Sequence, residues 1–190
     1  WRAGAGSIRA GVGEETRGAL AASTMCAGAG AGEAATGGGA GAAGGAGAGS
    51  GMTAGAGIIH EEFHSHEFTR RGGVIEMVQL WVNLPARVKM TPPRYQTLLD
   101  AQIPQAGLPA EAGRVRVVAG QFMAARGPAQ TFTPMDVWDM RLVAGADVQL
   151  EAPAGHTLAL VMLHGSVKVN GAQAGAGQLV HLDRAGRSEE

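Results

Sequence analysis

From Met52 onward, short apolar runs alternate with turn residues along the whole chain. Asn170-Gly171 is the usual signal of a two-residue β-hairpin, and helical periodicity is nearly absent. Many short strands at regular spacing favour an all-β sandwich or barrel. The strands that this pattern predicts cover 58–63, 74–84, 114–119, 136–143, 147–151, 157–163, 166–170 and 178–182.

The run at 74–84, VIEMVQLWVNL, is the strongest of these strands. Its alternate positions place Val78 and Val82 on one face and Met77 and Trp81 on the other. Both faces are apolar, which predicts a strand that is buried on both sides.

The first 51 residues have a different character. No apolar side chain larger than alanine lies between Cys26 and Met52. Such a stretch buries too little surface to offset its chain entropy, and each glycine opposes a helix by about 1 kcal/mol. This part of the chain is therefore predicted to be a low-complexity segment.

Composition excludes several classes of protein. Fifteen Lys and Arg balance sixteen Asp and Glu, so the basic field of a nucleic-acid-binding protein is missing. Cys26 is the single cysteine, which excludes a disulfide framework and a zinc site built from several thiolates. His156, His164 and His181 are far apart and predict no second site. With no long apolar run and no signal-peptide pattern, we expect a cytoplasmic protein that does not span a membrane.

The segment 60–67 gathers three of the six histidines. As a helix it would satisfy H-E-x-x-H, with His60 and His64 on zinc and Glu61 as general base. As a strand it would place His60, Glu62, His64 and His66 on one side, a donor set that suits Fe(II), Mn, Ni, Cu or Zn. A solvated loop is the third reading, and the residue types alone leave all three open.

Several motifs in a fixed order resemble the pirin family. Together with the region 153–169, they extend the resemblance from Met52 to Leu182. The motifs are MTAGAGIIHEE at 52–62, QLWVNLP at 79–85, KMTPPRYQ at 89–96, GRVRVV at 113–118 and TFTPMD at 131–136.

The resemblance implies a bicupin, which is two jelly-roll β-barrels in one chain. On that basis the low-complexity segment 1–51 stands in place of the first part of the N-terminal cupin. Residues 52–90 would be the rest of the N-terminal cupin, 91–113 a linker, and 114–190 the C-terminal cupin. In family members the C-terminal cupin is longer. Three origins of the segment 1–51 are open: a genuine replacement, an out-of-frame translation of GC-rich coding sequence, or a run of placeholder residues. The close resemblance to the family after Met52 favours a reading-frame or sequence-quality origin.

The resemblance also implies Fe(II) or another divalent transition metal in the N-terminal barrel. Family members bind it with a His-x-His pair and a later His-x-Glu pair, and His60 and Glu62 match the later pair. The earlier pair is expected near 15–18, but no histidine precedes His60. Half of the implied metal site is therefore missing from this sequence.

The activity that the resemblance implies is quercetin 2,3-dioxygenation. A flavonol binds the metal through its deprotonated hydroxyl, dioxygen attacks, the central ring opens and carbon monoxide leaves. His60 and Glu62 would be metal ligands, and Glu62 would also act catalytically by taking the hydroxyl proton. The alternatives are a metal- or redox-sensing regulator that acts through a protein partner, and an inactive fragment. We expect a flavonol-like small molecule or a protein as partner, with no direct binding of nucleic acid or membrane.

Overall fold

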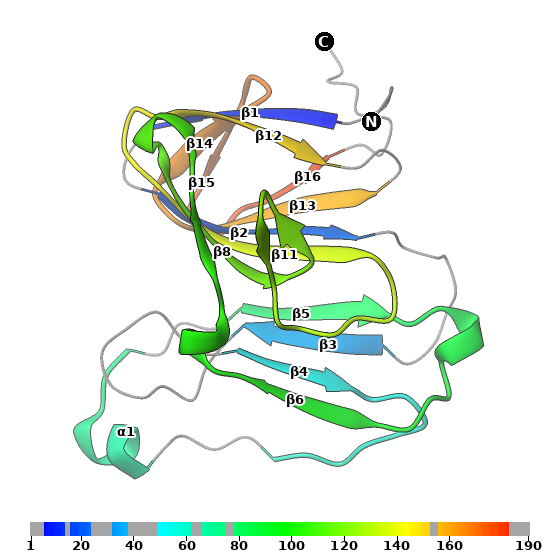
Figure 1. The fold of residues 1–190 in the computed structure, drawn as a ribbon. Helices are drawn as coiled ribbons and strands as arrows, with labels where there is room; N and C mark the ends of the chain where they lie inside the picture. The colour runs from blue at the N-terminus through cyan, green and yellow to red at the C-terminus, as the bar shows by residue number, and fades with distance from the viewer. Residues whose placement is uncertain are drawn as a thin grey trace. The chain divides into compact units, whose positions relative to one another are not determined.

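A computed structural model describes residues 6–13, 16–23, 32–37, 49–61, 66–74, 78–152 and 156–182. Nearly all regular structure in these residues is β-strand, which confirms the predicted all-β class (Figure 1). The chain divides into two compact units. Unit 1 combines Trp1–Met25 with Pro104–Glu190, and unit 2 is Cys26–Ile103. Within the described ranges, no helix is long and apolar enough to cross a membrane.

Unit 1 contains two antiparallel sheets. The larger has the strand order β16-β13-β2-β11-β8-β7 and the smaller β12-β1-β14-β15. The strands of the larger sheet are β16 (Leu179–Leu182), β13 (Thr157–His164), β2 (Thr16–Ser23), β11 (Met135–Leu142), β8 (Gly113–Ala119) and β7 (Gln105–Gly107). Those of the smaller are β12 (Asp147–Ala152), β1 (Gly6–Val12), β14 (Ser166–Val169) and β15 (Ala172–Gly175). A hairpin, β9 (Gln121–Phe122) with β10 (Ala125–Arg126), and the 3-10 turn η3 (Pro109–Glu111) complete the unit.

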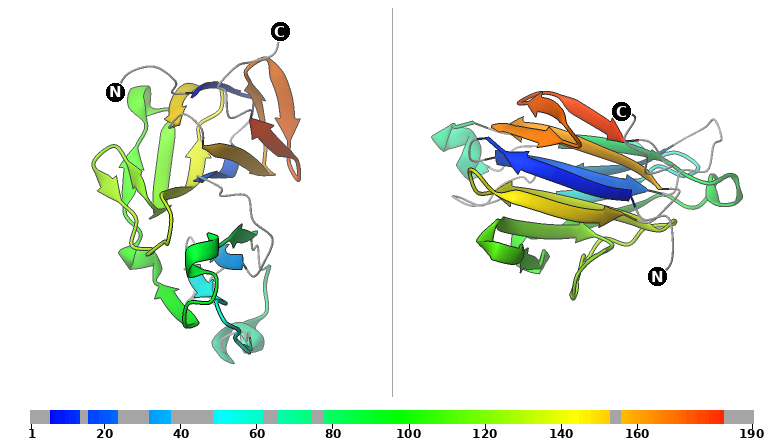
Figure 2. Two further views of the ribbon diagram at one scale, coloured as in Figure 1. Left: turned by 90° about the vertical axis from the view of Figure 1, so that its right-hand side faces the viewer. Right: turned by 90° about the horizontal axis from the view of Figure 1, so that it is seen from above.

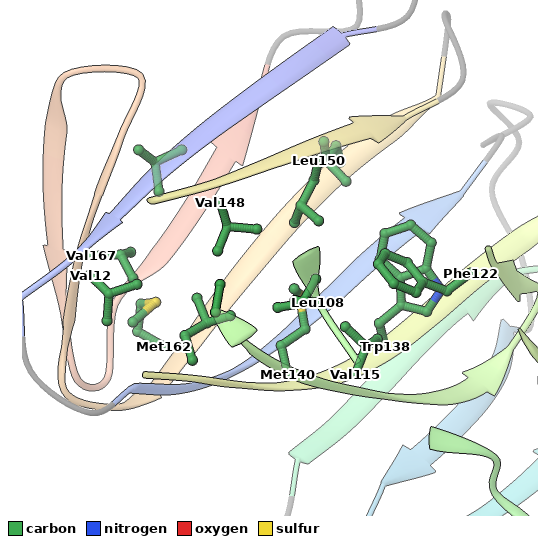
Figure 3. Close-up of a cluster of buried hydrophobic side chains, with 14 of the residues drawn as sticks. Val12, Leu108, Val115, Phe122, Trp138, Met140, Val148, Leu150, Met162 and Val167 are labelled. Carbon is green, nitrogen blue, oxygen red and sulfur yellow. The ribbon is translucent and has the colours of Figure 1, made fainter. Parts of the chain in front are cut away.

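The core of unit 1 is formed by the facing sides of its two sheets. Val115 and Val117 of β8 are fully buried, and Trp138 and Met140 of β11 lie beside them. Trp138 meets Phe122 edge to face, with ring centroids 5.0 Å apart. Figure 3 shows this aromatic pair at one end of the cluster. Alternate residues of each strand therefore enter one continuous apolar core.

The strands β1 and β2 come from the segment predicted to be low-complexity, yet they lie inside the sheets of unit 1. β1 pairs with β12 and β14, and β2 pairs with β11 and β13. Figure 2 shows the blue N-terminal strands among yellow and orange strands from late in the chain. Backbone N–H and C=O groups pair whatever the side chain, and the neighbouring strands supply most of the apolar volume.

Unit 2 is built on one antiparallel sheet with the strand order β5-β3-β4-β6. Val82, Leu84 and Leu98 are buried in this unit, and so is Thr53. The strands are β5 (Val78–Asn83), β3 (Gly32–Gly37), β4 (Gly49–Thr53) and β6 (Arg94–Leu98), accompanied by α1 (His66–Arg71), η1 (Ala86–Val88) and η2 (Asp100–Gln102).

Two predictions for unit 2 are wrong in the described residues. Residues 58–61 form no strand, because the partner strand β6 ends its pairing with β4 at Thr53. The strand predicted over 74–84 is limited to 78–83, and its two faces are not both buried. Trp81 is 71% exposed, whereas Val82, on the opposite face of β5, is buried. Val74 precedes β5 and is 94% exposed.

The domain bounds 1–51, 52–90, 91–113 and 114–190 stay a prediction. The region 91–113 contains β6, η2, β7 and η3. The other strands predicted beyond residue 113 are confirmed to within about two residues. The predicted hairpin is confirmed as well: Val169 of β14 pairs with Ala172 of β15, and Asn170 and Gly171 both have positive φ.

Candidate functional site

The candidate metal segment follows β4 through a tight turn. Gly57 N–H donates to Ala54 O at 2.8 Å, and Ala56 N–H donates to Thr91 O at 3.0 Å. Gly55 has a φ of 49° and lies so close to the Thr91 carbonyl that a side chain there would collide with it. Glycine is therefore required at this turn, which directs the chain from β4 into 58–61.

Of the two predicted metal ligands, the structure describes one. His60 is exposed on the irregular segment 58–61, and the neighbouring Ile59 is 99% exposed. Glu62, also the predicted catalytic residue, lies outside the described residues, as does His64. His66 begins α1 and is exposed.

The helical and the strand readings of 60–67 are both wrong where the structure can test them. Residues 60–61 have no regular structure, while His66 belongs to a helix, so no single strand presents these side chains together. Across the described part of the chain, no group of three or more His, Cys, Asp or Glu side chains could hold a metal ion. His60 and Glu62 as ligands therefore stay a prediction.

Unit 2 contains an aromatic row that the sequence reading did not identify. Trp81 of β5 pairs with Ala34 of β3, Ala34 pairs with Met52 of β4, and Met52 pairs with Tyr95 of β6. Paired residues lie on the same face of a sheet, so this aromatic row crosses all four strands. Trp81 is 71% and Tyr95 is 60% exposed. Gln79 and Asn83, which flank Trp81 at alternate positions, were the available sign of a solvent-facing side.

On the opposite face of the same sheet lies Thr53, which is 1% exposed. Its Oγ1 is buried without a hydrogen-bond partner in the described part of the chain. One hydroxyl cannot replace the imidazole and carboxylate ligands that a transition metal needs.

Unit 1 offers no metal site in its described core, which is made of apolar side chains. Its buried charges lie on the other side of the large sheet, where Arg116 Nη1 donates to Asp139 Oδ2 at 2.9 Å. His164 and His181 are exposed and His156 is half-buried. Among the described residues, these histidines belong to no group of three or more His, Cys, Asp or Glu side chains that could hold a metal ion.

Comparisons with known proteins agree on the relationship. The chain is 53% identical over 132 residues to a Pseudomonas aeruginosa protein named "Putative quercetin 2,3-dioxygenase", a match that covers 70% of this chain and 46% of the relative. It is 38% identical over 120 residues to Pirin-1 of Arabidopsis thaliana, covering 63% of this chain and 39% of the relative. No protein-family model matches the chain.

Among solved structures, a quercetin 2,3-dioxygenase from Acinetobacter baumannii aligns with a TM-score of 0.70 and 39% identity, covering 96% of this chain and 61% of that one. The chain spans about half the length, or less, of the two curated relatives named above. The ordered motifs, the all-β structure and these similarities lead to one conclusion: the chain belongs to the pirin family and has an all-β cupin fold.

Proposed function

We propose that the protein acts in metal-dependent quercetin (flavonol) 2,3-dioxygenation, with His60 and Glu62 in the metal site. The observation that carries this proposal is the 53% identity to a relative with that printed name. A matching fold adds support, because the chain aligns with a quercetin 2,3-dioxygenase at a TM-score of 0.70.

The metal, Fe(II) or another divalent transition ion, comes with this proposal from the family. The described residues do not fit it by themselves, because they contribute His60 and assemble no group of three donors. We therefore derive no reaction step through a metal. The role assigned to this chain's own residue is proton transfer: the Glu62 carboxylate accepts the proton of the flavonol hydroxyl.

The test measures bound metal and loss of the quercetin absorbance in air, using protein supplied with Fe(II). We expect about one metal per chain, and we expect His60→Ala to abolish metal binding and turnover together. Glu62→Gln should lower turnover by about a hundredfold or more, the usual contribution of a general base. His181→Ala, which changes an exposed histidine of unit 1, is the matched control. Wild-type protein that binds no metal and leaves quercetin intact would overturn the proposal.

A second candidate function is a non-catalytic protein that acts through a partner. The observation that favours it is the aromatic row on unit 2, where Trp81 and Tyr95 remain more than half exposed. Large exposed aromatics on one face of a sheet are typical of interaction surfaces. Metal binding without quercetin turnover would favour this function, whereas turnover that survives in Trp81→Ser would favour the enzyme.

A further inference from the structure

The four described strands of the unit 2 sheet present one uncharged face. This face carries the aromatic row, in which Trp81 lies on β5 and Tyr95 lies on β6. The same strands contain two charged residues, Glu33 and Arg94, and both pair with Thr53, which lies on the opposite face. The register of these strands therefore places no Asp, Glu, Lys or Arg on the face of the aromatic row.

Polar but neutral groups accompany the two rings. Gln79 lies two positions before Trp81 in β5, and Thr97 lies two positions after Tyr95 in β6. Each therefore shares the face of its aromatic neighbour, and both side chains are exposed. An amide and a hydroxyl donate and accept hydrogen bonds without carrying a charge. This face thus combines exposed rings with neutral hydrogen-bonding groups.

The two rings are too far apart for a single small ring to contact both. The path from Trp81 to Tyr95 leads from β5 to β3, from β3 to β4 and from β4 to β6, strands that lie side by side in Figure 1. With about 4.8 Å between neighbouring strands, the backbones of these two residues are about 14 Å apart. A ligand that stacks on both rings must therefore be a chain of several rings.

The missing charge decides between the chains that could stack here. Sheets with exposed aromatics bind single-stranded nucleic acids, but those proteins add basic groups that follow the phosphates. Protein partners are steered and oriented by charged groups around the contact. The face of the aromatic row has no charged residue at its register positions. A neutral chain of sugar rings fits better, because its apolar ring faces stack on aromatics and its hydroxyls pair with amide and hydroxyl groups.

We propose that the aromatic row binds a neutral, extended oligosaccharide of the β-linked glucan type. One sugar ring stacks on Trp81 and a later ring of the same chain stacks on Tyr95. Gln79 and Thr97 form hydrogen bonds with the hydroxyls of the rings beside them. This binding is separate from the proposed flavonol chemistry, so a protein without quercetin turnover still binds the oligosaccharide.

The experiment is a calorimetric titration of the full chain with cellohexaose and, in parallel, with glucose. We expect saturable binding of cellohexaose and far weaker binding of glucose, which reaches only one ring. Trp81→Ala and Tyr95→Ala should each weaken cellohexaose binding about tenfold or more, as the loss of one stacking contact does. Trp81→Phe, which keeps a ring, should recover part of that affinity. Met90→Ala removes an exposed side chain of unit 2 outside the four strands, and this matched control should bind normally.

Cellohexaose that shows no saturable binding would overturn the proposal, as would equally tight binding of glucose or an equal loss of affinity in Met90→Ala. Trp81 is 71% exposed, so Trp81→Ala is expected to fold. If far-UV circular dichroism shows that it does not, normal binding in Tyr95→Ala would contradict the proposal.

Two further measurements test the other occupants of this face. A single-stranded oligonucleotide whose binding is lost in Trp81→Ala would assign the face to nucleic acid. A dimer in light scattering that dissociates in Trp81→Ala would assign it to a second copy of the chain. Either result would overturn the oligosaccharide proposal.

Discussion

Unit 1 and unit 2 are both antiparallel β-structures, but they differ in how many side chains their sheets bury. Unit 1 has two sheets with a shared apolar core, and unit 2 has one sheet of four strands in its described part. Among the residues that the structure describes, six of the nine exposed large hydrophobic side chains belong to unit 2, Trp81 and Tyr95 among them. Backbone pairing is thus sufficient to align strands, whereas a core also requires a second layer of large side chains.

The most direct way to break this comparison is to truncate a core residue of unit 1. Trp138→Ala removes a ring that is 5% exposed and packs against Phe122. We expect the free energy of unfolding to fall by about 3–5 kcal/mol, because a cavity remains where the ring was. Urea denaturation followed by far-UV circular dichroism measures the loss. A cost below about 1 kcal/mol would mean that unit 1 has no tightly packed core.

A second test concerns the buried ion pair of unit 1. Asp139→Asn removes the negative charge that is paired with the guanidinium of Arg116, a side chain that is 4% exposed. We expect a loss of about 3 kcal/mol in the same denaturation experiment. The double variant Arg116→Met with Asp139→Leu should recover most of that loss, because no isolated charge is then buried. A double variant as unstable as the single one would contradict this explanation.

Two glycines in unit 1 test how much close backbone packing contributes to stability. Both Gly113 and Gly145 have positive φ, but a Cβ at Gly113 would collide with the Arg141 carbonyl, while the space around Gly145 is open. We expect Gly145→Ala to cost about 1 kcal/mol from backbone strain alone, and Gly113→Ala to cost about 3 kcal/mol. Thermal melts of the two variants provide the comparison, and equal melting temperatures would show that the contact at Gly113 relaxes easily.

The smallest effect is expected in unit 2. Trp81→Ala changes the same residue type as Trp138→Ala, at a position that is 71% exposed. We expect a change within about 0.5 kcal/mol, since little surface is buried by this ring. Measured by the same urea titration, a cost of several kcal/mol would show that Trp81 is covered in solution, and the contrast between the units would then be wrong.

The strands after residue 113 could be predicted from sequence because alternation and turn residues agree there. Val115, Met140 and Met162 face the core at alternate positions, and Asn170-Gly171 forms the predicted hairpin. The first four strands could not be predicted, because Ala and Gly carry no periodic signal and their pairing depends on partners elsewhere in the chain.

The candidate sites show the same division. The ligand pattern at 60–67 could be read as helix, strand or loop, and the sequence does not show that 60–61 are irregular while His66 begins a helix. The aromatic row was hidden for a different reason. Trp81 and Tyr95 belong to different strands and share a face of the sheet only through strand register.

The central position of β2 has a consequence for the rate of folding. Leu20 pairs with Trp138 on one side and with Leu160 on the other, so each contact closes a loop of more than a hundred residues. Closing such loops costs entropy before any contact forms, and proteins dominated by distant pairings fold slowly. During synthesis, β1 and β2 leave the ribosome long before their partners exist. Their small Ala and Gly side chains leave them little apolar surface for wrong associations while they wait.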